Sequence, residues 1–137
     1  MIYLTNTDQI SSQIFSLLSE KDKKFLFYSG KFTPDPNYLF SLVYKKKNKN
    51  IGFADIIYSS KYKQPYIALA VLPEYRNKGI AHQLLQKVEK ECVKSGYNIL
   101  YYSVNNPNNI SSINFAIKNN FIKESQLFDF ILFKKYL

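Results

Sequence analysis

The sequence contains one cysteine, one histidine and no tryptophan among its 137 residues. Cys92 therefore has no partner for an internal disulfide, which favours a reducing compartment. A chain of this length buries roughly two-thirds of its unfolded surface on folding, so its core needs no disulfide. No cluster of histidine and cysteine is available either, and we expect no metal site.

Long apolar segments are missing as well. The longest spans residues 66–72, far short of a membrane helix. The first five residues show no basic stretch followed by an apolar one, so we expect no signal peptide. Together with the unpaired Cys92, these absences predict a cytoplasmic protein with no membrane partner.

Acidic residues are scarce: ten stand against nineteen basic ones, and the net charge is +9. Such a charge is compatible with nucleic-acid binding. However, lysine, asparagine, isoleucine and tyrosine are all abundant, as expected from an AT-rich genome, and most lysines then form a solvated surface. Nucleic acid remains an alternative partner, with the run Lys45-Lys46-Lys47 as its contact.

Hydrophobic residues make up 46% of the chain and aromatic residues 17%, which indicates an ordered globular protein. Its length predicts one domain over residues 1–137. Apolar patterns and turn residues predict strands at 2–5, 38–44, 51–58, 66–72, 97–104, 121–123 and 127–136, with a hairpin tip at 45–50. They also predict four helices: one that starts after Asp8, one over 22–30, one over 79–95 and one from Ser111 or Ser112 to Asn119. This order predicts an α/β fold built on a mixed sheet with helices on both faces.

The helix at 79–95 has the clearest pattern. Its apolar positions recur at spacings of three and four, which predicts one buried stripe: Ile80, Leu84, Leu85, Val88 and Cys92. We therefore expect Cys92 to be a core residue rather than a reactive thiol. Gly96 ends this helix in the left-handed conformation, and Asn120 is expected to do the same for the later helix.

Arg76 is the only arginine, and it opens the run Arg76-Asn77-Lys78-Gly79-Ile80-Ala81. A guanidinium suits phosphate oxygens, and a helix N-terminus offers free N–H groups with a partial positive charge. Gly79 has no Cβ, so a bulky ligand can approach the backbone. The run therefore predicts a diphosphate site, although it lacks both the G-K-[ST] ending of a Walker loop and the glycines of a dinucleotide fingerprint.

Two segments resemble the motifs of the GCN5-related N-acetyltransferase (GNAT) family. Residues 69–81 read L-A-V-L-P-E-Y-R-N-K-G-I-A, similar to the family's strand L-A-V-x-P-x-x-R with its pattern [QR]-x-x-G-x-[GA]. Residues 109–121 read N-I-S-S-I-N-F-A-I-K-N-N-F, similar to the family's N-x-x-S-I-x-F-Y-x-K-x-G-F. The resemblance implies a GNAT-like fold: a mostly antiparallel, twisted sheet of six to seven strands that splays between the fourth and fifth strands.

The resemblance also implies acetyl-CoA as cosubstrate. Backbone N–H groups from Asn77 through Lys78, Gly79 and Ile80 to Ala81 would hold its diphosphate, with Arg76 and Lys78 adding charge. The main chain of Leu69, Ala70 and Val71 would bind the pantetheine arm as an extra strand, and the Val71 N–H would polarise the acetyl carbonyl. Asn109, or Asn108 in its place, would hydrogen-bond the cofactor, and Phe115 would pack against it.

The chain departs from the family at the tyrosine that protonates the leaving thiolate, because Ala116 stands there. A thiolate is a fair leaving group, with a pKa near 8.5 by analogy with cysteine. Tyr101 or Tyr102 on the preceding strand is a substitute acid, and we take Tyr102 as the candidate. Asp55 is the candidate base; an ordinary strand-face charge is its alternative reading. Glu74 and His82 are weaker bases, better explained as surface or phosphate-proximal residues.

The resulting hypothesis is an N-acetyltransferase that lets a neutral amine attack the acetyl thioester directly in a ternary complex, without a covalent enzyme intermediate. Its acceptor is a small amine, an antibiotic amine or a protein amine; the sequence does not separate these. A non-catalytic acyl-CoA-binding or regulatory module is the alternative, favoured by Ala116. Because the family often dimerises through sheet edges, the resemblance also implies a possible homodimer.

Overall fold

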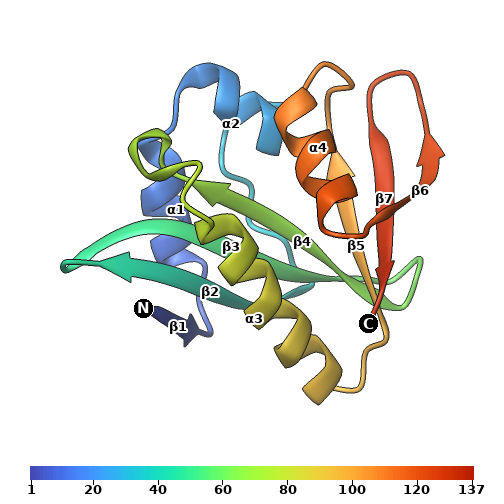
Figure 1. The fold of residues 1–137 in the computed structure, drawn as a ribbon, viewed down its shortest axis with the longest axis horizontal. Coiled ribbons are helices and arrows are strands. Elements are labelled where there is room, and N and C mark those ends of the chain that lie inside the picture. The colour runs from blue at the N-terminus through green and yellow to red at the C-terminus, as the bar shows by residue number, and fades with distance from the viewer.

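The computed structural model describes all 137 residues and has one seven-stranded sheet with four α-helices (Figure 1). In chain order the elements are β1 (Ile2–Thr5), α1 (Gln9–Ser16), α2 (Glu20–Leu26), β2 (Tyr38–Lys46), β3 (Lys49–Ser59), β4 (Gln64–Val71), a 3-10 turn (Pro73–Tyr75), α3 (Ile80–Lys94), β5 (Ile99–Val104), α4 (Ile110–Lys118), β6 (Ile122–Gln126) and β7 (Ile131–Tyr136). This confirms the predicted order and the mixed α/β class. None of the helices is both long and apolar enough to span a bilayer.

The strands lie in the order β1-β2-β3-β4-β5-β7-β6. Every neighbouring pair is antiparallel except β4 and β5, which run parallel and pair only through Tyr66 with Tyr101 and Ile67 with Tyr102. Beyond those residues the two strands diverge, so the sheet splays at its centre, as the family resemblance implies. The splay leaves one edge of β4 without a partner strand.

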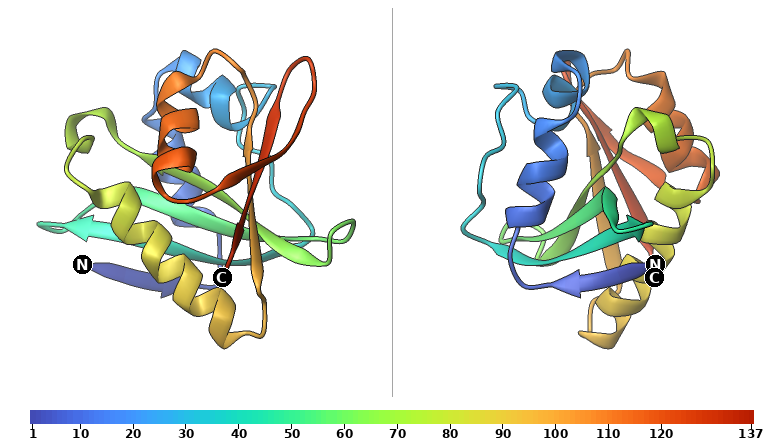
Figure 2. Two further views of the ribbon diagram at one scale, coloured as in Figure 1. Left: turned by 45° about the vertical axis from the view of Figure 1, so that its right-hand side comes forward. Right: turned by 90° about the vertical axis from the view of Figure 1, so that its left-hand side faces the viewer.

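Helices cover both faces of the sheet, with α1 on one side and α3 on the other (Figure 2). Because successive side chains of a strand point to opposite faces, β3 serves both sides. Asp55 contacts Ser11 of α1, whereas a Cβ built on Gly52 would meet Leu84 of α3. The predicted stripe of α3 is confirmed: Ile80, Leu84, Leu85, Val88 and Cys92 are all buried.

Several predicted boundaries are wrong by a few residues. Ser19 caps α2 by accepting from the Asp22 N–H, so this helix begins at Glu20 and ends at Leu26, before the predicted stop at Gly30. Helix α4 is capped by Asn109 rather than by either predicted serine, because the Asn109 side chain accepts from the N–H of Ser112. An asparagine in the preceding loop thus competes successfully with serines inside the first turn.

The turn residues explain the remaining elements. The hairpin tip between β2 and β3 contracts to Lys47 and Asn48, which both have positive φ, as a two-residue hairpin requires. The predicted strand ends shift here, since β2 extends to Lys46 and β3 starts at Lys49. Asn120 adopts φ 69° after α4 and Gly96 adopts φ 90° after α3, which confirms both left-handed helix ends.

Candidate active site

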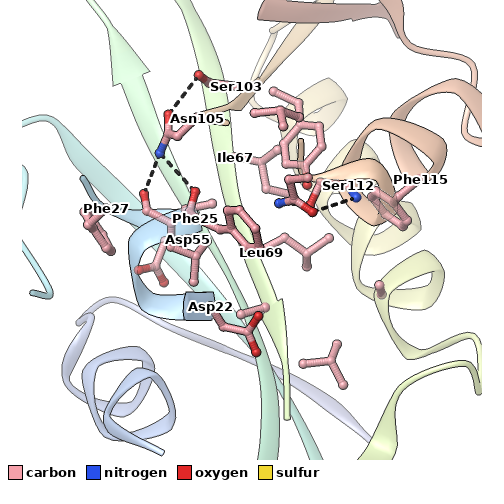
Figure 3. Close-up of a pocket in the computed structure, with 18 of the residues that line it drawn as sticks. Asp22, Phe25, Phe27, Asp55, Ile67, Leu69, Ser103, Asn105, Ser112 and Phe115 are labelled. Atoms are coloured by element: carbon pink, nitrogen blue, oxygen red, sulfur yellow. Dashed lines mark hydrogen bonds between the residues drawn. The ribbon is translucent and has the colours of Figure 1, made fainter. Parts of the chain in front are cut away.

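A cavity of about 1520 Å³ opens where β4 and β5 diverge. Its walls come from both faces of the sheet: α2 and the loop before β2 on the α1 side, and the first turn of α3 with most of α4 on the other. Figure 3 shows Asp55 and Phe115 on opposite sides of this space, with Leu69 between them. A ligand lying across β4 can therefore meet a second ligand that enters from the other face.

The free edge of β4 presents main-chain groups to the cavity. Leu72 N–H donates to Ile51 O at 2.8 Å, so even-numbered residues of β4 point their backbone groups toward β3 and odd-numbered ones point away. The backbone groups of Ala70 point toward β3, since its carbonyl lies against Gly52. The backbone groups of Leu69 and Val71 point away from β3, and their N–H groups face the splay.

The turn that follows β4 has the backbone of an anion-binding concavity. Asn77 and Gly79 both have positive φ, 61° and 78°, and α3 begins at the next residue, Ile80. A Cβ added to Gly79 would meet nothing within 4 Å, so the space above the turn is open. Successive N–H groups in such a conformation converge on a negative ligand, and the helix dipole supports it.

The two charged side chains of this turn point in different directions. Arg76 turns inward: its Nε donates to the Val71 carbonyl at 2.8 Å, and its Nη2 lies 3.1 Å from Asp22 Oδ2 of α2. Lys78 does not line the cavity, and its ammonium lies 5.7 Å from the ring centroid of Tyr75. Of these two predicted phosphate ligands, the structure therefore places only Arg76 beside the cavity.

Asp55 lies at the floor of the cavity, 4% exposed. Ser11 and Ser41 donate to its Oδ1 at 2.5 and 2.6 Å, and its Oδ2 receives no hydrogen bond. Every fully enclosed side-chain oxygen of the protein has a hydrogen-bond partner, so the unpartnered Oδ2 must reach open space. Burial raises the pKa of Asp55 to about 6, the charge of Asp8 adds to the rise, and the serine hydroxyls oppose it.

The hydroxyl network behind Asp55 is absent from the sequence-based prediction. Ser41 has one proton and gives it to Asp55, so the Tyr38 hydroxyl, 2.6 Å from Ser41 Oγ, is the donor in that contact. The result is a chain from Tyr38 through Ser41 to Asp55. Ser41 is the cross-strand partner of Asp55, and knowing the register of β2 against β3 is the only way to find it.

Tyr101 and Tyr102, the two candidate acids, lie on opposite faces of β5. Tyr102 lines the cavity and packs on Phe115 and Phe121, whereas Tyr101 stacks on Tyr62 at 4.5 Å. Burial raises the pKa of Tyr102, and a hydrogen bond with Ser112 opposes the rise. Tyr102 thus remains protonated at neutral pH and lies on the α4 side of the cavity.

Two helix residues predicted to contact the cofactor line the same cavity. Phe115 presents its ring there, but the Asn109 side chain is already engaged: it caps α4 and donates to Ser112 Oγ at 2.8 Å. His82 Nδ1 lies 2.6 Å from Asn119 Oδ1, and Asn119 Nδ2 donates to the Phe115 carbonyl. This pairing orients the amide, so His82 Nδ1 carries the proton and links α3 to α4.

A family model described as "Acetyltransferase (GNAT) family" matches residues 6–121. The match includes β4, the turn before α3 and all of α4, the parts that line the cavity. The chain belongs to the GNAT acetyltransferase family. No curated protein matches the sequence.

Solved GNAT structures share this fold at low identity. The GNAT domain of S. lividans PAT is 11% identical with a TM-score of 0.84, over 99% of this chain and 89% of that one. A ribosomal-protein-alanine N-acetyltransferase from Brucella melitensis is 14% identical with a TM-score of 0.76, over 100% and 99%. The PaiA N-acetyltransferase from Thermoplasma acidophilum, solved in complex with coenzyme A, is 18% identical with a TM-score of 0.74, over 100% and 99%.

In this GNAT fold the position that corresponds to the family tyrosine is buried away from the cavity. Ala116 is fully buried in the core cluster and does not line the cavity, whereas its neighbours Ser112 and Phe115 do. Helix α4 therefore offers no phenol to the site. Tyr102 of β5, which packs on Phe115, presents a phenol to this side of the cavity instead.

Proposed function

We propose that this protein is an acetyl-CoA-dependent N-acetyltransferase that acetylates an amine in a ternary complex. The observation that carries the proposal is the unpaired edge of β4, which leads from an open helix N-terminus to a buried carboxylate in one continuous cavity. Membership of the GNAT acetyltransferase family supports it.

The cofactor would lie along β4. Its diphosphate would accept hydrogen bonds from the backbone N–H groups of residues 77–81, with Arg76 as the adjoining charge. The pantetheine amides would pair with the main chain of Leu69, which leaves the Val71 N–H for the acetyl carbonyl; the Val71 carbonyl already accepts from Arg76. The Phe115 ring would pack against the arm. Among the residues of the predicted strand contact, Ala70 would contribute only its side chain, because its carbonyl faces β3.

The reaction would be a direct substitution at the acetyl carbonyl. The amine nitrogen forms the C–N bond, the C–S bond breaks, and the Val71 N–H stabilises the oxyanion that develops between these events. The proton lost by the amine goes to Asp55 Oδ2, directly or through one water. The leaving thiolate takes the proton of Tyr102. A pKa of about 6 leaves Asp55 mostly ionised at neutral pH, yet close enough to that pH to act as a general base.

An assay of thiol release from acetyl-CoA over a panel of amines tests the proposal. It predicts amine-dependent release in the wild type that falls by ~10²–10⁴-fold in Asp55→Asn. The alternative, a non-catalytic acyl-CoA-binding module, is favoured by the buried alanine at position 116. It predicts tight cofactor binding with no amine-dependent release at all.

A further inference from the structure

Acidic side chains without an ion-pair partner gather in the cavity, although the chain is strongly basic. The five ion pairs of the molecule use five of its ten acidic residues, namely Glu20, Asp22, Glu89, Glu91 and Glu124. Three of the five acids left without a basic partner line the cavity: Asp8, Asp35 and Asp55. Three of the nineteen basic side chains also line the cavity, namely Lys21, Arg76 and Lys118. Arg76 pairs with Asp22, the Lys21 ammonium lies over the Phe25 ring, and Lys118 belongs to α4 on the opposite wall, so the acids near α1 keep no basic partner.

Asp55 provides the second, independent sign of a ligand. Its side chain is buried, both serine donors bind Oδ1, and Oδ2 is left without a partner at the cavity surface. Oδ2 is therefore the atom of this otherwise buried carboxylate that a ligand in the cavity can reach. An ammonium group supplies both the donor and the opposite charge.

Asp8 lies at the N-cap of α1 and makes no capping hydrogen bond with its side chain. Nothing else in the protein binds its carboxylate, which lines the cavity. Ser11, the donor to Asp55, comes three residues later, and positions three apart on a helix have Cβ atoms about 5–6 Å apart. The charge of Asp8 also raises the pKa of both Asp55 and Tyr38.

The third carboxylate, Asp35, is already occupied. It accepts from the Asn37 N–H at 2.8 Å and from the Tyr66 hydroxyl at 2.9 Å. The wall beside it is aromatic: Phe27 and Phe32 line the cavity with their rings in edge contact at 5.4 Å. Asp8 and the unpartnered Oδ2 of Asp55 are connected through Ser11, which lies three residues after Asp8 and donates to Asp55. Two anionic groups beside an apolar wall match a ligand with two cationic ends and a hydrocarbon centre.

We propose that the acetyl acceptor is an aliphatic amine that carries a second ammonium group. The amino group to be acetylated lies at Asp55 Oδ2, the second ammonium group pairs with Asp8, and the methylene chain between them packs on the aromatic wall. This inference rests on the proposed acetyltransferase function and specifies its substrate class.

Two amines of equal chain length, diaminobutane and butylamine, test the inference. Thiol release is measured with each, and their binding to the wild type in the presence of coenzyme A is followed by calorimetry. The wild type is expected to favour diaminobutane in kcat/KM by about tenfold or more. Asp8→Asn should bring this ratio close to one. Asp129→Asn, which neutralises an exposed acid outside the cavity, should leave the ratio as it is.

A ratio near one in the wild type would overturn the inference while leaving the acetyltransferase itself intact. A clear preference for a peptide with a free N-terminus over diaminobutane would also overturn it, in favour of a protein acceptor. If no amine releases thiol, the proposed function fails, and calorimetry then decides the substrate class. Preferential binding of diaminobutane, lost in Asp8→Asn, would still support a dicationic ligand, and equal or absent binding would refute one.

Discussion

The Arg76 guanidinium joins the turn between β4 and α3 to helix α2, with Nη2 3.1 Å from Asp22 Oδ2. The arginine and aspartate side chains are 39% and 24% exposed, so the pair is worth at most about 1 kcal/mol. A bound diphosphate would compete with Asp22 for the same donors. In the proposed complex, Arg76 would exchange Asp22 for a phosphate oxygen of the cofactor.

We predict that Arg76→Ala weakens acetyl-CoA binding by about tenfold or more, since a charged bidentate donor is lost. The acetyl-CoA affinity of Arg76→Lys should lie between those of the wild type and Arg76→Ala, because lysine keeps the charge but not the forked donor geometry. Asp22→Asn should bind up to about fivefold more tightly, because the competing carboxylate is gone. Calorimetric titration of each variant measures these effects. Glu20→Gln, which breaks an exposed pair on the same helix, is the control.

The two glycines that flank α3 allow a matched comparison. Gly79 and Gly96 both have positive φ, and neither has an atom within 4 Å of an added Cβ. A glutamate at either position therefore carries a similar backbone strain of about 1 kcal/mol. Gly79→Glu should abolish measurable acetyl-CoA binding, because it places a carboxylate in the anion site, and Gly96→Glu should not. Equal affinity in the two variants would show that the turn does not hold the cofactor.

Asp55 predicts a pH dependence of stability. Its pKa rises from 3.8 in the unfolded chain to about 6 in the folded one, so the folded state favours the protonated form. Its contribution to stability is complete below pH 4 and is lost as the pH rises through 6, a change of about 3 kcal/mol. In urea unfolding, the free energy of unfolding of Asp55→Asn should increase relative to that of the wild type by up to that amount between pH 4 and 7.

The exposed substitution Asp129→Asn should show no such trend in the same titration. The activity of the wild type should fall below about pH 6, where the base becomes protonated. A pH profile without this acid limb, or an Asp55→Asn variant that keeps full activity, would remove Asp55 from the mechanism.

The neighbouring tyrosines of β5 separate a catalytic hydroxyl from a structural one. Tyr102→Phe should lower kcat roughly 10- to 100-fold, at the low end for acid catalysis because a thiolate leaves readily. Tyr101→Phe removes a hydroxyl from the opposite face, where the ring stacks on Tyr62, and should leave kcat unaffected. The same small effect in both variants would mean that the thiolate departs without help from β5.

The sequence predicts the parts of the site that depend on local pattern. The stripe of α3, the left-handed Gly96 and Asn120, and the order of all elements follow from residues close together in the chain. The side-chain contacts of Lys78 and Asn109 could not be predicted in this way, because the Lys78 ammonium lies over the ring of Tyr75 and the Asn109 side chain caps α4. Both competitors lie nearby in the sequence, but nothing in the motif indicates which interaction prevails.

Long-range relationships escape the sequence altogether. Ser41 meets Asp55 through strand register, and Ser11 reaches the same carboxylate from a helix 44 residues away. Asp8 reads as an ordinary helix cap, whereas in the structure its side chain caps nothing and faces the cavity. Neither a spacing rule nor a family motif marks these residues, although the proposed acceptor site depends on them.

The most direct test of this account is residue-resolved amide hydrogen exchange with and without coenzyme A. The N–H groups of Leu69 and Val71 face the splay, whereas that of Ala70 is directed to β3. Binding of the pantetheine arm as an added strand should therefore slow exchange at Leu69 and Val71 and leave Ala70 nearly unchanged. If exchange at Leu69 and Val71 is the same with saturating coenzyme A as without it, the cofactor does not lie along β4.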